Sequence, residues 1–126
     1  MLLDNLSVGV DIEDVSRFEK YAEDRNAEFV KKIYTENEIN YCFRSKHPAK
    51  HLAARFCAKE AIYKAMSCLG FSDISFQDCE IVNEKNGAPK VVFLSEKFKN
   101  KVAVRISLSH SKTNAIAQVI AERLFP

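Results

Sequence analysis

Three acidic side chains of this 126-residue chain occupy positions from which they could bind a divalent cation. Asp11 and Glu13 share the polar face of an alternating segment, and Glu60 stands within a long apolar segment. Carboxylates that converge from separate segments repel one another unless a cation lies between them. Two other interpretations are open: Asp11 and Glu13 lie on a solvated strand face, or Glu60 forms an i,i+4 ion pair with Lys64.

Basic side chains precede and follow Glu60 and suit a phosphate-rich substrate. They are Arg44, Lys46, His47, Lys50, His51, Arg55, Lys59 and Lys64. Magnesium takes one or two protein carboxylates and completes its shell with water and substrate phosphates. Phosphoryl-type transfer needs neutralised charge and alignment more than covalent help from the protein. A few acids among many cations therefore favour a magnesium–phosphate site, although a solvated basic helix has the same composition.

A strand and a helix must position the first two acids. Residues 7–13 alternate apolar and polar side chains, which is typical of a strand with Gly9, Asp11 and Glu13 on one face. The other face consists of Val8, Val10 and Ile12. From Asp14 the spacing changes to that of a helix, with Val15 and Phe18 on one side.

Two further helices follow. Thr35 and Glu38 form the pattern of a capping box, which predicts a helix that begins there and ends before residues 44–46. Pro48 suits the first turn of a longer helix over residues 48–69. This helix is apolar around most of its circumference and is therefore expected to be buried, so its charged residues need partners or a cleft.

The second half of the chain changes to strands. Residues 74–82 and 90–94 flank Asn86-Gly87, a strong hairpin signal. After a short helical stretch over residues 96–101, residues 102–109 and 114–121 predict a second hairpin. This order of elements predicts an α+β fold, with a largely antiparallel sheet packed against helices.

Length and composition restrict the classes of protein. The chain has room for a single domain over residues 1–126. Its net charge of +2 is too small to indicate nucleic acid, and no apolar run approaches the length of a membrane span. The four cysteines, Cys42, Cys57, Cys68 and Cys79, form no C-x-x-C pair and have no histidine at ligand spacing, so we expect free thiols and a cytoplasmic location.

Three motifs, in order along nearly the whole chain, resemble those of the 4'-phosphopantetheinyl transferases. Gly9-Val10-Asp11-Ile12 with Arg17-Phe18 resembles the first motif, and residues 55–65 resemble the second, F-x-x-K-E-A-x-x-K-A. Residues 107–111, Ser-Leu-Ser-His-Ser, resemble the third, S-x-S-H-[ST]. Phe76-Gln77-Asp78 and residues 86–89 are similar to segments of the short bacterial type, the holo-[acyl-carrier-protein] synthases.

The resemblance implies a fold, a reaction and a partner. The fold is that of the 4'-phosphopantetheinyl transferases. The reaction moves 4'-phosphopantetheine from coenzyme A, the co-substrate, to a serine of an apo-acyl carrier protein. Its products are the holo-acyl carrier protein and adenosine 3',5'-bisphosphate. The family's short members form homotrimers with active sites at subunit boundaries, and the apolar residues of segments 103–108 and 115–120 suit a sheet face that meets a partner.

The resemblance also implies roles for individual residues. Asp11 and Glu60 hold Mg²⁺, Glu60 also accepts the serine proton, and Lys64 neutralises the diphosphate. The candidates for the nucleotide's phosphates are Lys46, Arg55 and His110, whereas His47 and His51 are expected at the surface. Arg17 is the candidate for carrier-protein docking, and a metal role for Glu13 is open. The family's glycine-rich turn after the second motif is reduced here to Gly70.

Two classes of function remain to be separated. An enzyme of this family needs both Asp11 and Glu60. A binding module for a phosphorylated ligand or an acidic protein gains nothing from these carboxylates unless a metal intervenes. A nucleic-acid binder would need a larger basic excess and exposed stacking aromatic residues.

Overall fold

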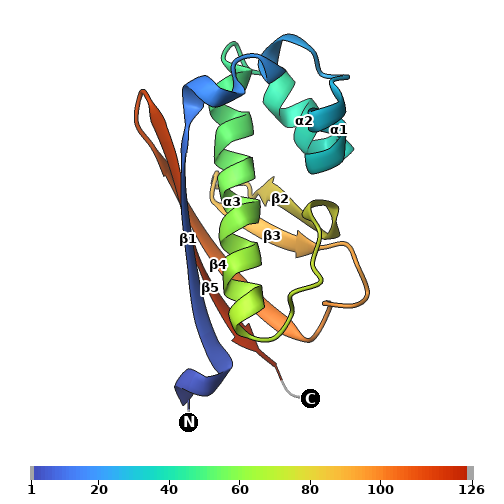
Figure 1. The fold of residues 1–126 in the computed structure, drawn as a ribbon, viewed down its shortest axis with the longest axis vertical. Helices are drawn as coiled ribbons and strands as arrows, with labels where there is room; N and C mark the ends of the chain where they lie inside the picture. The colour runs from blue at the N-terminus through green and yellow to red at the C-terminus, as the bar shows by residue number, and fades with distance from the viewer. Residues whose placement is uncertain (1, 125–126) are drawn as a thin grey trace.

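The fold of the computed structural model, which describes residues 2–124, is built around one long helix (Figure 1). This helix, α3 (Pro48–Cys68), lies along one face of a three-stranded antiparallel sheet. The strands are β1 (Leu6–Asp14), β5 (Asn114–Arg123) and β4 (Val102–His110), in the order β1-β5-β4. The short strands β2 (Cys79–Asn83) and β3 (Pro89–Phe93) form a second antiparallel sheet beside α3. The α+β prediction is confirmed.

Helix α3 forms and ends as its sequence predicts. Pro48 occupies the first turn, where the missing N–H is not needed. At the other end Gly70 adopts φ +92°, and the N–H groups of Gly70 and Phe71 donate to Ser67 O and Met66 O at 3.0 and 2.9 Å. This Schellman motif ends the helix one residue before the predicted boundary. Both groups of buried hydrophobic side chains include residues of α3, so the helix connects the two parts of the core.

The segment between β1 and α3 differs from its prediction. The expected helix from Asp14 is two 3₁₀ turns, η2 (Val15–Phe18) and η3 (Tyr21–Glu23), and α1 (Glu28–Ile33) was not predicted. These elements are short and rely on aromatic packing, including Tyr21 stacked on Phe29 at 4.1 Å between ring centroids. Helix α2 (Glu36–Phe43) has the predicted capping box: Thr35 N–H donates to Glu38 at 2.8 Å, and Glu38 N–H donates to Thr35 at 3.3 Å.

The predicted hairpins are confirmed, with two local corrections. The first hairpin turns at Gly87, whose φ is +89°, but β2 begins at Cys79 because the 3₁₀ turn η4 (Phe76–Asp78) precedes it. The predicted helical stretch over residues 96–101 is a series of turns, in which Asn100 has a φ of +64°. A left-handed residue interrupts a right-handed helix, so the helix does not form. A four-residue 3₁₀ turn, η1 (Leu2–Asn5), precedes β1.

Strand β1 turns its polar face toward α3 and its apolar face outward. Val8, Val10 and Ile12 are 65%, 54% and 61% exposed. Gly9 is buried against α3, where a Cβ would lie 2.0 Å from Ala61 O. The missing side chain at Gly9 lets β1 and α3 approach closely, which places Asp11 and Glu13 at the edge of this contact. Within residues 2–124 no helix is long and apolar enough to cross a membrane.

Candidate active site

Strand β1 and helix α3 bring Asp11, Glu60 and Lys64 together. The Asp11 side chain is only 12% exposed, and its Oδ1 lies 3.3 Å from Lys64 Nζ. The same ammonium donates to Val10 O at 3.0 Å. The ion pair of Lys64 is therefore with Asp11, and none with Glu60 occurs among the described residues. The interpretation of Asp11 as part of a solvated strand face is wrong.

The acids of this cluster carry more negative charge than their neighbours balance. Asp11 Oδ2 is buried without a hydrogen-bond partner among the residues that the structure describes. Burial, and then the neighbouring Asp11, raises the pKa of Glu13 to about 7, although Arg17 opposes the shift. Burial and then Asp11 also raise the pKa of Glu60, against Lys64 and Arg17. A cation among these carboxylates would relieve both effects.

The carboxylates of the cluster suit a magnesium ion whose other ligands are substrate phosphates and water. Residues 2–124 contain no group of three or more His, Cys, Asp or Glu side chains arranged to hold a metal ion. Magnesium needs only one or two protein carboxylates when substrate phosphates and water supply its other ligands. The unpartnered Asp11 Oδ2 and the partly buried Glu60 meet that requirement.

Arg17 lies beside the cluster, half-exposed. Its Nη1 lies 2.6 Å from Glu13 Oε1, and its guanidinium carbon lies 5.1 Å from the centre of the Phe56 ring. The Arg17 side chain is 51% exposed, so it is accessible to a partner while it balances part of the acidic charge.

Arg55 is a buried cation without a counter-charge. It is 3% exposed, and its guanidinium carbon lies 3.9 Å from the centre of the Tyr41 ring. Nη2 donates to Asn83 Oδ1 at 2.6 Å, whereas Nε has no hydrogen-bond partner among the described residues. No carboxylate within residues 2–124 forms an ion pair with it. An anion would compensate the cost of burying this charge.

The other predicted phosphate ligands lie on the surface near the N-terminus of α3. Lys46 is exposed and lines a hollow of about 510 Å³ together with Lys50 and Lys112. His110 is exposed at the end of β4. It pairs with Ala115, which pairs with Glu13, so His110 lies two strands from Glu13 on one rung of the sheet, about 10 Å away.

His51 is less exposed than expected. It is half-buried and packs edge-on against Tyr41, with ring centroids 5.4 Å apart. Burial, and then the charges of Arg55, Lys50 and His110, lower the pKa of His51. These groups therefore form one basic region at this end of α3, and His51 belongs to it.

Sequence reasoning missed an apolar pocket next to Glu60. The pocket has a volume of about 370 Å³, and Tyr63, Ile74 and Phe76 line it together with Glu60. Tyr63 follows Glu60 by three residues on α3, so helical spacing could have placed these two side chains near each other. The opposite wall comes from the segment before β2, and its position depends on tertiary packing alone.

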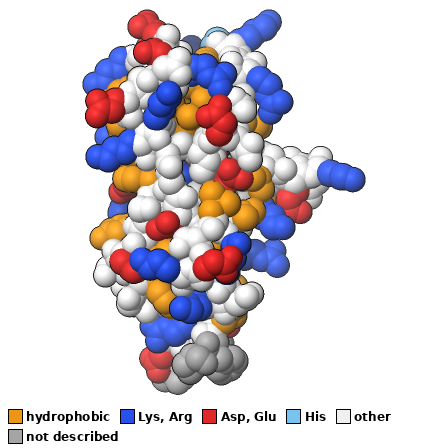
Figure 2. Space-filling model, turned by 90° about the vertical axis from the view of Figure 1, so that its right-hand side faces the viewer, with side chains coloured by type: hydrophobic (Ala, Val, Ile, Leu, Met, Phe, Trp, Pro, Cys, Tyr) orange, Lys and Arg blue, Asp and Glu red, His pale blue; other side chains and the backbone are white. Residues whose placement is uncertain are grey.

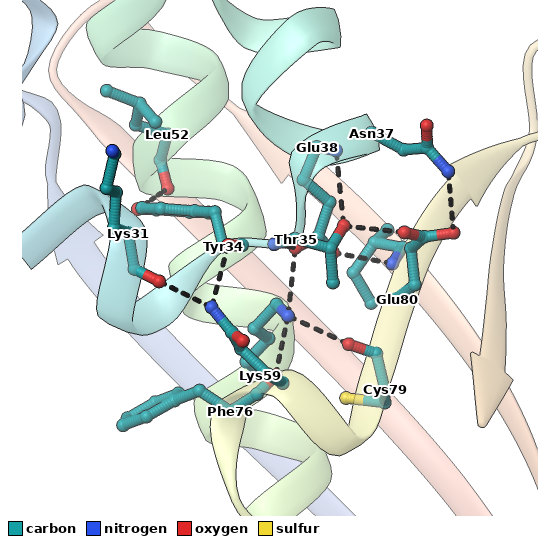
Figure 3. A network of polar contacts seen from close by, with 12 residues as sticks. Lys31, Tyr34, Thr35, Asn37, Glu38, Leu52, Lys59, Phe76, Cys79 and Glu80 are labelled. Atoms are coloured by element: carbon teal, nitrogen blue, oxygen red, sulfur yellow. Dashed lines mark hydrogen bonds and ion pairs between the residues drawn. The ribbon is translucent and has the colours of Figure 1, made fainter. Parts of the chain in front are cut away.

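Lys59 is not available to a phosphate, although it was expected among the basic side chains that suit a phosphate-rich substrate. Its side chain is buried and forms an ion pair with Glu38 at 2.9 Å. Lys59 lines the same pocket, but its ammonium points to protein oxygen atoms (Figure 3).

Comparisons with known proteins identify the family. A family model described as the 4'-phosphopantetheinyl transferase superfamily matches residues 7–120. A holo-[acyl-carrier-protein] synthase of Chloroherpeton thalassium is 40% identical over 119 residues, which cover 93% of this chain and 98% of that protein. The corresponding protein of Geotalea daltonii is 37% identical over 120 residues, covering 91% and 96%.

Solved structures of such synthases have the same fold. The Bacillus anthracis holo-(acyl-carrier-protein) synthase, in complex with CoA (3',5'-ADP), matches with a TM-score of 0.76 and 34% identity over 93% of this chain and 96% of that chain. The Helicobacter pylori holo-[acyl-carrier-protein] synthase, in complex with coenzyme A, matches with a TM-score of 0.75 and 29% identity over 89% and 96%. This chain therefore belongs to the 4'-phosphopantetheinyl transferase superfamily and, within it, to the holo-[acyl-carrier-protein] synthases.

Proposed function

We propose that this protein transfers 4'-phosphopantetheine from coenzyme A to a serine of an apo-acyl carrier protein in a magnesium-dependent reaction. The observation that carries the proposal is the convergence of Asp11, Glu60 and Lys64 beside an apolar pocket. The two relatives given above are holo-[acyl-carrier-protein] synthases, and the Helicobacter pylori structure is a complex with coenzyme A. The charged cluster suits the diphosphate, and the pocket suits the pantetheine arm.

In this proposal the chain's residues neutralise charge and move one proton. Asp11 and Glu60 would hold Mg²⁺, which neutralises charge on the diphosphate when bound. Lys64, already directed toward Asp11, adds a second positive charge. The Glu60 carboxylate accepts the proton of the carrier serine, directly or through a water. The serine oxygen then bonds to the phosphorus nearer the pantetheine, and the bond to the departing adenosine 3',5'-bisphosphate breaks.

Arg55 and the exposed basic residues of the same end are assigned to the nucleotide's phosphates. Arg55 brings a buried guanidinium that forms no ion pair within the described part of the chain. Lys46 and His110 are the exposed candidates. Arg17, exposed beside Glu13, is assigned to the acidic carrier protein.

We further infer a homotrimer of single-domain chains with active sites at the subunit boundaries. The exposed apolar face of β1 and β5 supports an interface, since a closed symmetric assembly would bury it in every copy. Helix α3 contributes to both parts of the core, which supports one domain. All four cysteines are free thiols, which supports a reducing, cytoplasmic compartment.

A nucleic-acid partner has no support on the face that carries α1, α2 and the β2–β3 sheet. Basic and acidic side chains are mixed there, with hydrophobic ones between them (Figure 2). The basic stripe typical of a nucleic-acid interface is missing from this view.

The experiment is a transfer assay. The protein is incubated with coenzyme A, Mg²⁺ and an apo carrier protein, and mass spectrometry detects the gain of one phosphopantetheine. Chelation of the metal, Asp11→Ala and Glu60→Ala should each abolish the gain while the melting temperature stays near that of the wild type. Binding of coenzyme A without transfer would instead support a binding module, and unfolding of Glu60→Ala would assign Glu60 to the fold.

A further inference from the structure

Lys59 is a buried lysine whose three donors all meet protein oxygen atoms. Lys59 is 2% exposed. The ammonium donates to Phe76 O at 2.6 Å and to Cys79 O at 2.9 Å, and it lies 2.9 Å from Glu38 Oε1. Figure 3 shows these three contacts converging on Nζ, one from Glu38 of α2 and two from the segment that leads into β2. An ammonium has three N–H donors, so none remains for a substrate phosphate.

Glu38 extends the contacts of Lys59 to α2 and β2. Its Oε2 accepts from Ile81 N–H at 2.7 Å, and its Oε1 accepts from Thr35 N–H at 2.8 Å. Glu38 is 1% exposed, so these bonds are shielded from water. The Lys59–Glu38 pair therefore joins α3, α2 and the start of the second sheet in one buried network.

A second acid strengthens the same junction from the other side of Thr35. Glu80 Oε2 accepts from Thr35 Oγ1 at 2.6 Å, and Gln77 Nε2 donates to Tyr34 O at 3.0 Å (Figure 3). The segment from Phe76 to Glu80 is thus fastened to the α1–α2 corner as well as to α3. Lys59 is the only one of these groups that reaches this segment from α3 among the described hydrogen bonds.

The two carbonyl groups that Lys59 holds belong to one wall of the pocket. Phe76 and Cys79 line the pocket on the side of the second sheet, and Glu60 and Tyr63 line it on the side of α3. Lys59 therefore bridges the two walls. We propose that Lys59 is a positioning residue that fixes the wall of the pocket facing Glu60, and that it thereby sets the affinity for the pantetheine arm of coenzyme A.

This inference rests on the proposed function, because it takes the pocket to hold the arm. It goes further in assigning a task to a lysine that contacts neither substrate nor metal. The side chain suits the task, since the three donors of an ammonium spread around one nitrogen in three dimensions, whereas the donors of a guanidinium lie in one plane.

The test compares two ligands that differ by 4'-phosphopantetheine, that is, by the arm and the phosphate that carries it. Isothermal titration measures the Kd of coenzyme A and of adenosine 3',5'-bisphosphate, which has no arm, for the wild type and Lys59→Met. We expect the Kd of coenzyme A to rise about tenfold, the size of one lost contact, and that of the bisphosphate to stay within about twofold. The KM for coenzyme A should rise more than kcat falls.

Two companion variants keep the result interpretable. Lys59→Met/Glu38→Gln removes both charges of the pair, so neither is left buried alone, and it should fold if Lys59→Met does not. Lys99→Met removes a lysine from an exposed pair with Glu96 and should change neither Kd. Equal weakening of both ligands, no weakening of either, or failure of both Lys59 variants to fold would overturn the inference.

Tyr63→Ala separates this inference from the proposal beneath it. It removes part of the opposite wall without touching the Lys59 contacts. If coenzyme A binds more weakly to Tyr63→Ala but with unchanged Kd to Lys59→Met, the pocket still holds the arm and the role of Lys59 is rejected. Unchanged binding in Tyr63→Ala would remove the arm from this pocket, and the inference would fall with that assignment.

Discussion

Single residues of one chemical type perform different tasks here because their partners differ. Arg55 is buried and has no counter-charge among residues 2–124, Lys59 is buried with all donors used, and Arg17 is half-exposed beside Glu13. Only the partners distinguish a cation that awaits an anion from one that holds the fold. The contrast also bears on Arg17, which pairs with Glu13 and is proposed to dock the carrier protein as well, so a test must separate these two roles.

We expect Arg17→Gln to raise the KM for the carrier protein about tenfold at low salt and to leave the KM for coenzyme A within about twofold. Acyl carrier proteins are acidic, so the loss of one exposed cation weakens their encounter, and salt should narrow the difference. Steady-state kinetics at two ionic strengths measures both effects. Arg17→Lys, which keeps the charge, is the control. Equal changes in both KM values would remove Arg17 from the docking surface.

At the scale of elements, the contact between β1 and α3 decides the geometry of the site. Gly9 lies at the helix contact itself, two residues before Asp11, and a Cβ there would meet Ala61 O at 2.0 Å and Ala65 N at 3.0 Å. Both atoms are backbone of α3, so they cannot move aside. A side chain at Gly9 must therefore separate the strand from the helix and carry Asp11 away from Lys64.

Gly9→Ala should lower the free energy of unfolding by about 1–3 kcal/mol, the usual cost of overpacking. It should also lower kcat by more than this loss of stability explains, because Asp11 is displaced from the α3 residues. Denaturant unfolding and turnover below the melting transition measure the two effects. Val102→Ala, a core truncation in β4, is the control and should lose stability without a comparable loss of kcat. Full activity in Gly9→Ala would show that the close contact does not set the site.

At the scale of the whole molecule, one face of the three-stranded sheet is apolar and exposed. Val8 pairs with Ile120, and Ile12 pairs with Ile116, so these side chains form one patch across β1 and β5. Ile116 and Ile120 are 38% and 50% exposed. The outward residues of β4, Arg105, Ser107 and Ser109, make that strand the polar border of the patch. The apolar contribution comes from β1 and β5 rather than from both C-terminal strands.

Val10→Lys places a charge in the middle of this patch and should convert a trimer into monomers, as light scattering would show. If the active sites lie at subunit boundaries, transfer activity should fall with the assembly, while circular dichroism stays unchanged. Leu94→Lys, at an exposed hydrophobic residue outside the patch, is the control and should keep the assembly. A wild type of monomeric mass would contradict the trimer.

The sequence by itself determined the elements whose signals are local. The capping box at Thr35, the proline and glycine at the two ends of α3 and the turn at Gly87 each depend on neighbouring residues, and each appears as predicted. The motifs also identified the acids that converge. Helix α1 was not predicted, because six residues carry too little periodicity to identify a helix.

Only the tertiary structure decided which face of each element is buried and which charges pair. Alternation in β1 shows that Val10 and Asp11 point to opposite sides, but it does not say which side meets α3. The close contact at Gly9 turned the polar side inward. Lys59 forms an ion pair with Glu38, 21 positions earlier, and Lys64 forms one with Asp11 rather than with Glu60. Pairings between distant residues depend on how elements pack, which no local pattern contains.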